Sequence, residues 1–271
     1  MQSRKINQQR CLDIQSDKKR TLILDLKIAR FIVKKREMGK NQRYQLGALW
    51  NILDPLLLTL IYYFVFTVVK YNTNAGLLVI GISLCRGLQQ NLIYGATSNL
   101  DFTAGLKIER VRNRAIILSE FYHVVSHSFY SSIGTLMVLL ILDSSLWAIP
   151  LIPIVCILNG LMWYGYGRIL SNFVRKFPDL KNIIRYFGMM MFFTSPVLYP
   201  LSITTGLHRK LNLYNPFSFI SEPTRAILFG DSSYELLNFN VGLIILITSF
   251  ISLILGLLLL DRQRWSDSTW S

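Results

Sequence analysis

The chain has 271 residues, 52% of them hydrophobic, and a formal net charge of +14. A soluble protein with this charge would be expected to bind nucleic acid, but here the Lys and Arg residues flank long apolar stretches, where acidic lipid head groups account for them. The composition therefore argues against a soluble protein and against a nucleic-acid partner, and it predicts an all-α integral membrane protein.

Residues 1–48 are predicted to form a cytoplasmic N-terminal segment. They contain no apolar run followed by a small-residue cleavage site, so the first span is expected to act as the insertion signal and to remain in the protein. Residues 21–36 indicate a helix lying on the inner membrane surface, because its apolar and cationic side chains fall on opposite faces. The apolar face carries Leu22, Leu26, Ala29 and Val33, and the cationic face carries Lys27, Arg30 and Lys34. The alternative is an ordinary surface helix of a small cytosolic domain.

Six apolar stretches predict a transmembrane domain over residues 49–260, followed by a cytoplasmic tail at 261–271. The stretches cover residues 49–69, 76–100, 115–142, 147–169, 184–200 and 241–260. With the N-terminus inside, most Lys and Arg residues fall on the cytoplasmic side, as the positive-inside bias requires. We therefore expect a multi-pass protein of the cytoplasmic (inner) membrane with both termini in the cytoplasm.

The second stretch is unusual because its second half is polar. Arg86, Gln89, Gln90 and Asn91 lie within membrane depth, where exposure to lipid is costly, so this half must face protein or water. Arg86 is either a functional residue or a residue with a structural partner. The structural alternatives are a pair with Asp54, a backbone carbonyl, or extension of the side chain toward the outer surface.

Residues 201–240 form the longest segment predicted to lie on the outer side of the membrane. After the turn signal Asn215-Pro216, an apolar and aromatic run with helical character extends to Gly230. One helical crossing needs about 20 residues, so this run is too short to cross the membrane and return. It predicts a re-entrant or interfacial element before the last span.

Motifs for nucleotide hydrolysis or other catalysis are absent from the sequence. Gly39-Lys40 is followed by Asn41 and lacks the earlier glycine of a phosphate-binding loop, so ATP and Mg would have to be bound by a partner. HExxH and GxSxG do not occur, and the three cysteines are isolated. The chain is therefore expected to bind no cofactor of its own and not to be an enzyme.

Glu120, His123 and His127 share one face of the third predicted span, because they are spaced i, i+3 and i+7. Such a face could supply metal ligands. No second Glu/His pair accompanies it, so contacts with polar groups of neighbouring helices are the favoured interpretation and no metal site is predicted.

Aromatic residues crowd the first and fifth stretches. Those of interest are Tyr62, Tyr63, Phe192, Phe193 and Tyr199. Aromatic faces bind the C–H surfaces of sugars without holding them tightly, which suits a surface along which a glycan slides. For any single one of these residues, ordinary packing is the favoured alternative.

Several sequence segments resemble the permease subunits of type-2 ABC polysaccharide exporters, which export O-antigen, capsular polysaccharide and teichoic acid. RYQLGALWNILDPLLLTLIYYFVF (43–66) resembles their first span, and RGLQQNLIYGATSNLDFTAGLKIERV (86–111) is similar to their second span and coupling loop. FFTSPVLYPLSI (192–203) and LNLYNPFSFISEPTRAILFG (211–230) resemble the fifth span and the re-entrant helices after it. The most specific pattern consists of Asn215, Pro216, Glu222, Arg225 and Gly230. Arg86 and the polar run after it depart from the family pattern, and the first 20 residues lie outside the resemblance.

The resemblance implies a homodimeric permease with two separate cytosolic ABC ATPase subunits, which passes a lipid-linked glycan between its two protomers. It implies ATPase-coupling roles for Lys107, Glu109, Arg110 and Arg112. It implies an aromatic lining of the substrate pathway, whose candidates are Tyr62, Tyr63, Phe192, Phe193 and Tyr199. Independently of the resemblance, the polar half of the second stretch adds Arg86, Gln89, Gln90 and Asn91 as pathway candidates. We expect the outer element 211–230 to form the gate of this pathway, with Asn215, Pro216, Glu222, Arg225 and Gly230 as the candidate residues. The alternatives are an ABC-2 permease for a drug or small lipid and a membrane-embedded lipid-modifying enzyme that uses Glu120, His123 and His127.

Overall fold

The computed structural model describes residues 18–41, 49–69, 75–105, 113–140, 150–230 and 232–268. Within these ranges the regular structure is helical and contains no strand, which confirms the all-α prediction. The longer helices are α2 (Lys18–Asn41), α3 (Trp50–Val69), α4 (Ala75–Gly105), α5 (Asn113–Leu139), α6 (Leu151–Lys176), α7 (Leu180–Thr194) and α10 (Phe239–Ser268). The shorter elements are η3 (Leu201–Ile203), α8 (Gly206–Asn212), α9 (Ser218–Phe229) and η4 (Ser232–Leu236).

Each of the six predicted apolar stretches overlaps one helix, in chain order α3, α4, α5, α6, α7 and α10. Two segments of the described chain are long and apolar enough to cross a membrane: Gly76–Ser98 in α4 and Phe239–Leu258 in α10. The fifth stretch, 184–200, is helical only to Thr194. Ser195 is extended (φ −85°, ψ 161°) because it precedes Pro196, which disfavours helical geometry in the residue before it.

The chain divides into two compact units, the first formed by residues 1–47 and 108–123 and the second by residues 48–107 and 124–271. In the first unit, Arg36 of α2 donates from Nη1 to Oε1 of Glu120 on α5 at 2.9 Å, and the Glu120 side chain is fully buried. Arg30 lies over the ring of Tyr122, 5.9 Å from its centroid. These two contacts join α2 to the first turns of α5.

The predicted apolar face of α2 is partly buried within its unit and partly exposed. Ala29 and Val33 are buried, whereas Leu22 and Leu26 are 54% and 41% exposed. The buried face also includes Asp25 and Ile32, so it is rotated relative to the face predicted from Leu22. The carboxylate of Asp25 interrupts the apolar pattern of α2, and only the packing reveals that its side chain is buried.

In the second unit, α4 is the central helix and packs most extensively against α6. Glycines permit the close approach: a Cβ atom at Gly167 would collide with the Leu92 carbonyl, and one at Gly95 would lie 2.5 Å from the Tyr164 carbonyl. Asn159 of α6 donates to the Leu84 carbonyl of α4 at 2.9 Å. Small residues at the contact and hydrogen bonds across it are the usual means by which membrane helices associate.

Arg168 lies near the end of the fourth predicted stretch, within α6, and is fully buried. Its Nη1 donates to the Ser98 hydroxyl of α4 at 2.7 Å. Gly256 of α10 makes room for it, because a Cβ atom there would lie 2.7 Å from the Arg168 side chain. Arg168 thus stands where α4, α6 and α10 come together.

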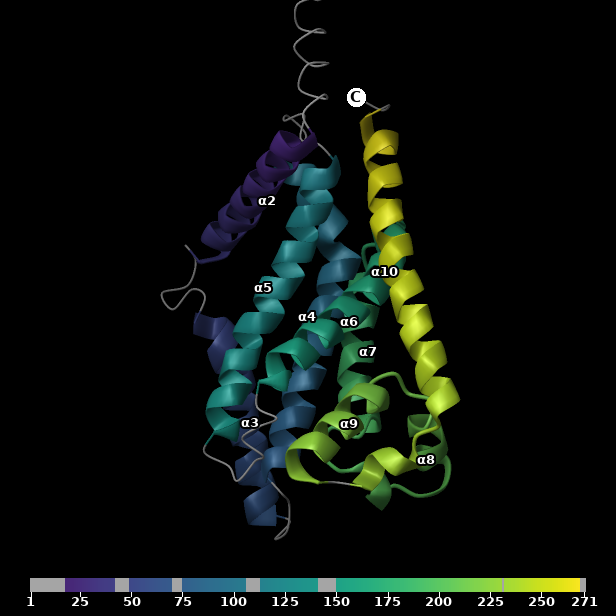
Figure 1. Ribbon diagram of the computed structural model, residues 1–271. Helices are drawn as coiled ribbons and strands as arrows, with labels where there is room; N and C mark the ends of the chain where they lie inside the picture. The colour runs from purple at the N-terminus through teal and green to yellow at the C-terminus, as the bar shows by residue number, and fades with distance from the viewer. Residues whose placement is uncertain are drawn as a thin grey trace, which may run out of the picture. The chain divides into compact units, whose positions relative to one another are not determined.

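In Figure 1, α10 runs alongside α6, and the short helices α8 and α9 lie at the end of the second unit farthest from the C-terminus. The outward side of α10 carries large exposed apolar residues, including Phe239, Leu246 and Phe250. An exposed apolar face of this length suits contact with lipid.

Candidate functional site

An ion pair joins α3 to α4 in the second unit. Arg86 donates from Nε to Oδ2 of Asp54 at 2.6 Å and from Nη2 to Oδ1 at 2.8 Å. Both side chains are 31% exposed. Of the structural partners considered from the sequence, Asp54 is therefore the one that Arg86 contacts.

Two glutamines extend this pair to a third helix. Gln89 accepts from Arg86 Nη1 at 3.2 Å and donates to the Gly188 carbonyl of α7 at 3.0 Å. Gln90 donates to Oδ2 of Asp54 at 3.3 Å. A Cβ atom at Gly188 would lie 3.1 Å from the Gln89 side chain, so glycine there allows α7 to come close to α4. One chain of polar contacts therefore connects α3, α4 and α7.

Aromatic residues continue the contact between α3 and α7. The rings of Tyr62 and Phe192 lie 5.0 Å apart, and Phe192 stacks edge-to-face on Phe193 at 5.2 Å. Phe192 is buried, whereas Phe193 is 63% exposed. We refer to Asp54, Tyr62, Arg86, Gln89, Gln90, Phe192 and Phe193 as the three-helix wall.

Two other pathway candidates, Asn91 and Tyr199, are not part of this wall. Asn91 is buried and donates to the Gly87 carbonyl of its own helix at 2.8 Å, on the side that packs against α6. Tyr199 lies after α7, where its hydroxyl donates to the Phe193 carbonyl at 3.1 Å. The side chain of Tyr63 lies outside the described residues.

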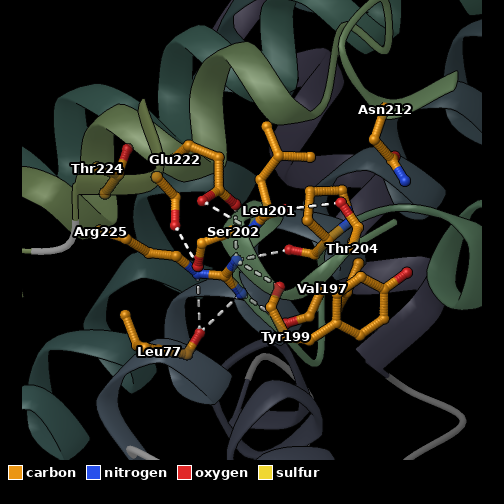
Figure 2. A network of polar contacts seen from close by, with 12 residues as sticks. Leu77, Val197, Tyr199, Leu201, Ser202, Thr204, Asn212, Glu222, Thr224 and Arg225 are labelled. Atoms are coloured by element: carbon orange, nitrogen blue, oxygen red, sulfur yellow. Dashed lines mark hydrogen bonds and ion pairs between the residues drawn. The ribbon is translucent and has the colours of Figure 1, made fainter. Parts of the chain in front are cut away.

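Arg225 of α9 forms a second polar centre, which Figure 2 shows. Its side chain is fully buried, and its guanidinium donates to four backbone carbonyls and to Glu222 Oε1, the last at 2.8 Å. The carbonyls belong to Leu77, Pro196, Val197 and Tyr199. We refer to Arg225, Glu222 and these carbonyls as the arginine hub.

The hub explains how the non-helical backbone after α7 is accommodated in the interior. Buried carbonyls without a partner are costly, and residues 196–199 provide few partners for one another. Arg225 supplies donors to three of these carbonyls, and Glu222 Oε2 accepts from the Leu201 amide at 3.3 Å. Gly81 of α4 leaves the space, because a Cβ atom there would collide with the Val197 carbonyl and lie 2.5 Å from Arg225 Nη2.

The remaining residues of the sequence pattern shape the same region. Asn215 accepts from the Phe217 amide at 3.0 Å, which forms the turn before α9, and it donates to the Ser195 hydroxyl at 2.8 Å. Pro216 lies within that turn. Gly230 ends α9 with a left-handed φ of +69°, a conformation that favours glycine. All five residues of the pattern therefore build the local fold of this element.

Side chains from α8 complete the end of α7, which the sequence did not predict. The Thr194 carbonyl accepts from His208 Nε2 and from Asn212 Nδ2, both at 2.8 Å. The last carbonyls of a helix have no partner within it, so these donors satisfy a backbone need. Ser195-Pro196, which directly follows Thr194, is the sequence signal that could have indicated a helix end in need of such a cap.

The other candidates are placed as follows. Lys107, Glu109, Arg110 and Arg112 lie outside the described residues. Glu120 contacts Arg36, which agrees with the polar-contact interpretation of its helix face. Among the described residues, no group of three or more His, Cys, Asp or Glu side chains is arranged to hold a metal ion.

Residues 30–229 match the family described as ABC-2 type transporter. The chain is 27% identical over 230 residues to an O-antigen export system permease protein RfbA of Klebsiella pneumoniae, covering 81% of this chain and 85% of that protein. A second protein of that name from the same organism is 25% identical over 228 residues, with the same coverage. The protein of that name from Myxococcus xanthus is 27% identical over 192 residues, covering 68% of this chain and 73% of its own length. With most of its length matched, the chain is an integral membrane transport subunit and belongs to the ABC-2 type transporter family.

Proposed function

We propose that this chain is the permease subunit of an ATP-driven exporter that moves a lipid-linked polysaccharide across the cytoplasmic membrane. The observation that carries the proposal is the similarity, over 81% of the chain, to relatives named as O-antigen export permeases. The three-helix wall adds physical support, because it combines an aromatic surface with amide and charged groups, as weak binding of a sugar polymer requires.

The proposed topology has six spans, provided by α3, α4, α5, α6, α7 and α10, with both termini in the cytoplasm. The positive-inside bias of the sequence supports this orientation. Exposed cations and exposed apolar residues occur together on α2, which supports its assignment as the interface helix. Two copies of the chain would face each other across the pathway, since a single chain has no second similar half to complete it.

ATP hydrolysis is assigned to a separate ABC ATPase partner. The chain has no phosphate-binding loop, so it cannot bind ATP in the usual manner. Lys107, Glu109, Arg110 and Arg112 are the proposed contact with that partner, because they form a short, mixed-charge segment at the inner face. Residues 211–230, which the arginine hub holds together, are the proposed outer gate and would move as one rigid element.

The proposal is tested by replacing Tyr62 and Phe193 together by alanine in the organism that carries the chain, with the variant as its only copy. Loss of the aromatic surface is expected to reduce surface polysaccharide strongly while the protein still inserts and accumulates. The matched control is Phe250→Ala on α10, because Phe250 and Phe193 are each 63% exposed. The pathway assignment is wrong if both variants export normally. The proposed substrate is wrong if deletion of the chain leaves the surface polysaccharide unchanged.

A further inference from the structure

We propose that Arg86 binds the phosphate group of an anionic amphiphile, and that the Asp54 carboxylate occupies its guanidinium until that group arrives. The proposal rests on the proposed function, since a glycan carried on a lipid through a phosphate linkage is such an amphiphile. It adds to that function a site, a chemical group that the site recognises, and a competition that controls access to it.

The ion pair of Arg86 with Asp54 joins two helices, but this role alone does not explain why a charged residue lies at this position. The residue lies near the middle of the candidate span Gly76–Ser98, where a charged side chain is costly. Replacing a buried ion pair by apolar residues is often neutral or stabilising, so packing alone does not require one here. The Arg86 and Asp54 side chains are also 31% exposed, whereas Arg225 and Glu222 in the hub are completely enclosed. The Arg86 pair is therefore open on one side.

The geometry of the pair suits exchange of one anion for another. Arg86 presents Nε and Nη2 as a fork to both oxygens of Asp54, and the same fork fits two oxygens of a phosphate. Gln89 accepts from Nη1 and is itself fixed to the Gly188 carbonyl. Arg86 therefore keeps one of its contacts, and its orientation, when Asp54 leaves.

The Asp54 carboxylate does not depend on Arg86 alone. It lies about one turn from the start of α3, where the partial positive charge of the helix N-terminus stabilises a carboxylate. Gln90 contacts the same carboxylate at 3.3 Å, and its amide is free to turn to a phosphate oxygen once Asp54 moves. Rotation of one side chain thus opens the site without breaking a backbone hydrogen bond.

An apolar surface lies beside the charged one. Leu57 and Ile61 follow Asp54 on one face of α3 and are 47% and 55% exposed. A hydrocarbon chain can lie along them while its phosphate contacts Arg86, which selects an amphiphile over a free phosphate ion. Because Asp54 joins α3 to α4, its displacement would also loosen the contact between these two helices.

The test uses the full-length chain in phosphatidylcholine nanodiscs and measures binding of farnesyl diphosphate by microscale thermophoresis, with farnesol and inorganic pyrophosphate as partial ligands. The expected order is farnesyl diphosphate strongest, with either partial ligand weaker. Arg86→Gln is expected to weaken binding about tenfold or more, because a forked, charge-assisted contact is lost. Asp54→Asn is expected to tighten binding several-fold, because the competing charge is gone. Arg175→Gln, an exposed cation on α6, is the control and should bind like the wild type.

The opposite signs of the two substitutions separate this idea from a purely structural ion pair. If Asp54 only supports the fold, Asp54→Asn weakens binding as Arg86→Gln does, and the proposal fails. Equal binding of farnesol and farnesyl diphosphate also overturns it. Phosphatidylglycerol that competes as well as farnesyl diphosphate would assign the site to bulk lipid and refute its role toward a carrier. Because the assay measures neither export nor ATP hydrolysis, a negative result here leaves the proposed transport function standing.

Discussion

Replacing Arg225 by lysine tests whether the arginine hub holds the backbone after α7 in place. Arg225 contacts five acceptor atoms, four of them carbonyl oxygens, at 2.6 to 3.2 Å. Lysine keeps the charge but has three donors on a single nitrogen, so at least two acceptors lose their partner. A buried acceptor without a partner costs about 1–3 kcal/mol, which gives a loss of about 2–6 kcal/mol.

The assay is thermal unfolding of the purified chain in detergent, followed by tryptophan fluorescence. For a chain of this size, the loss corresponds to a decrease in Tm of about 4–11 °C. The matched control is Arg185→Lys, because Arg185 is an exposed arginine of α7 and the same atoms are exchanged. A Tm for Arg225→Lys that equals the wild type and the control would show that the hub contacts contribute nothing to stability, and would refute the reasoning.

Two further substitutions test close approach and the contact at α2. Gly81→Ala is expected to destabilise the chain by about 1–3 kcal/mol, because its Cβ would collide with the Val197 carbonyl. The control Gly242→Ala places its Cβ against the Phe219 ring, which can turn, so it should have little effect on Tm. Equal stability of the two variants would contradict this. Glu120→Ala is expected to speed hydrogen–deuterium exchange of the α2 amides by removing a buried ion-pair partner, compared with the exposed control Glu235→Ala. Unchanged exchange in α2 would mean that other contacts hold the helix.

The sequence predicted the helices well, because long apolar runs are a strong signal that depends on local composition. It placed the end of the fifth run incorrectly, although Pro196 marked the break after Thr194. It also gave no sign of the buried carboxylate on α2. A buried carboxylate such as Asp25 runs against hydrophobic periodicity, so only the three-dimensional packing reveals it.

The candidate sites were predictable to different degrees. Asp54 was among the partners named for Arg86, since an intramembrane cation calls for an anion on a neighbouring helix. The hub was not predictable in the same way. Arg225 and Leu77 are 148 residues apart, and the acceptor is a backbone carbonyl. Every residue has such a carbonyl, so the residue type at position 77 does not indicate the contact. Contacts between two side chains can be anticipated from residue types, whereas contacts of a side chain to the backbone cannot.

The two arginine networks differ in a way that bears on movement. The acceptors of Arg225 are mostly carbonyls, which cannot turn away unless the backbone itself changes, and the side chain is enclosed on all sides. The main acceptor of Arg86 is the side chain of Asp54, which can move away by rotation about its own side-chain bonds. Both side chains of this pair are already partly exposed. A conformational change needs an element with two accessible arrangements, and the side-chain network offers one at lower cost. We therefore expect the three-helix wall to rearrange during transport while the arginine hub keeps α9 and the turn after α7 as one rigid piece.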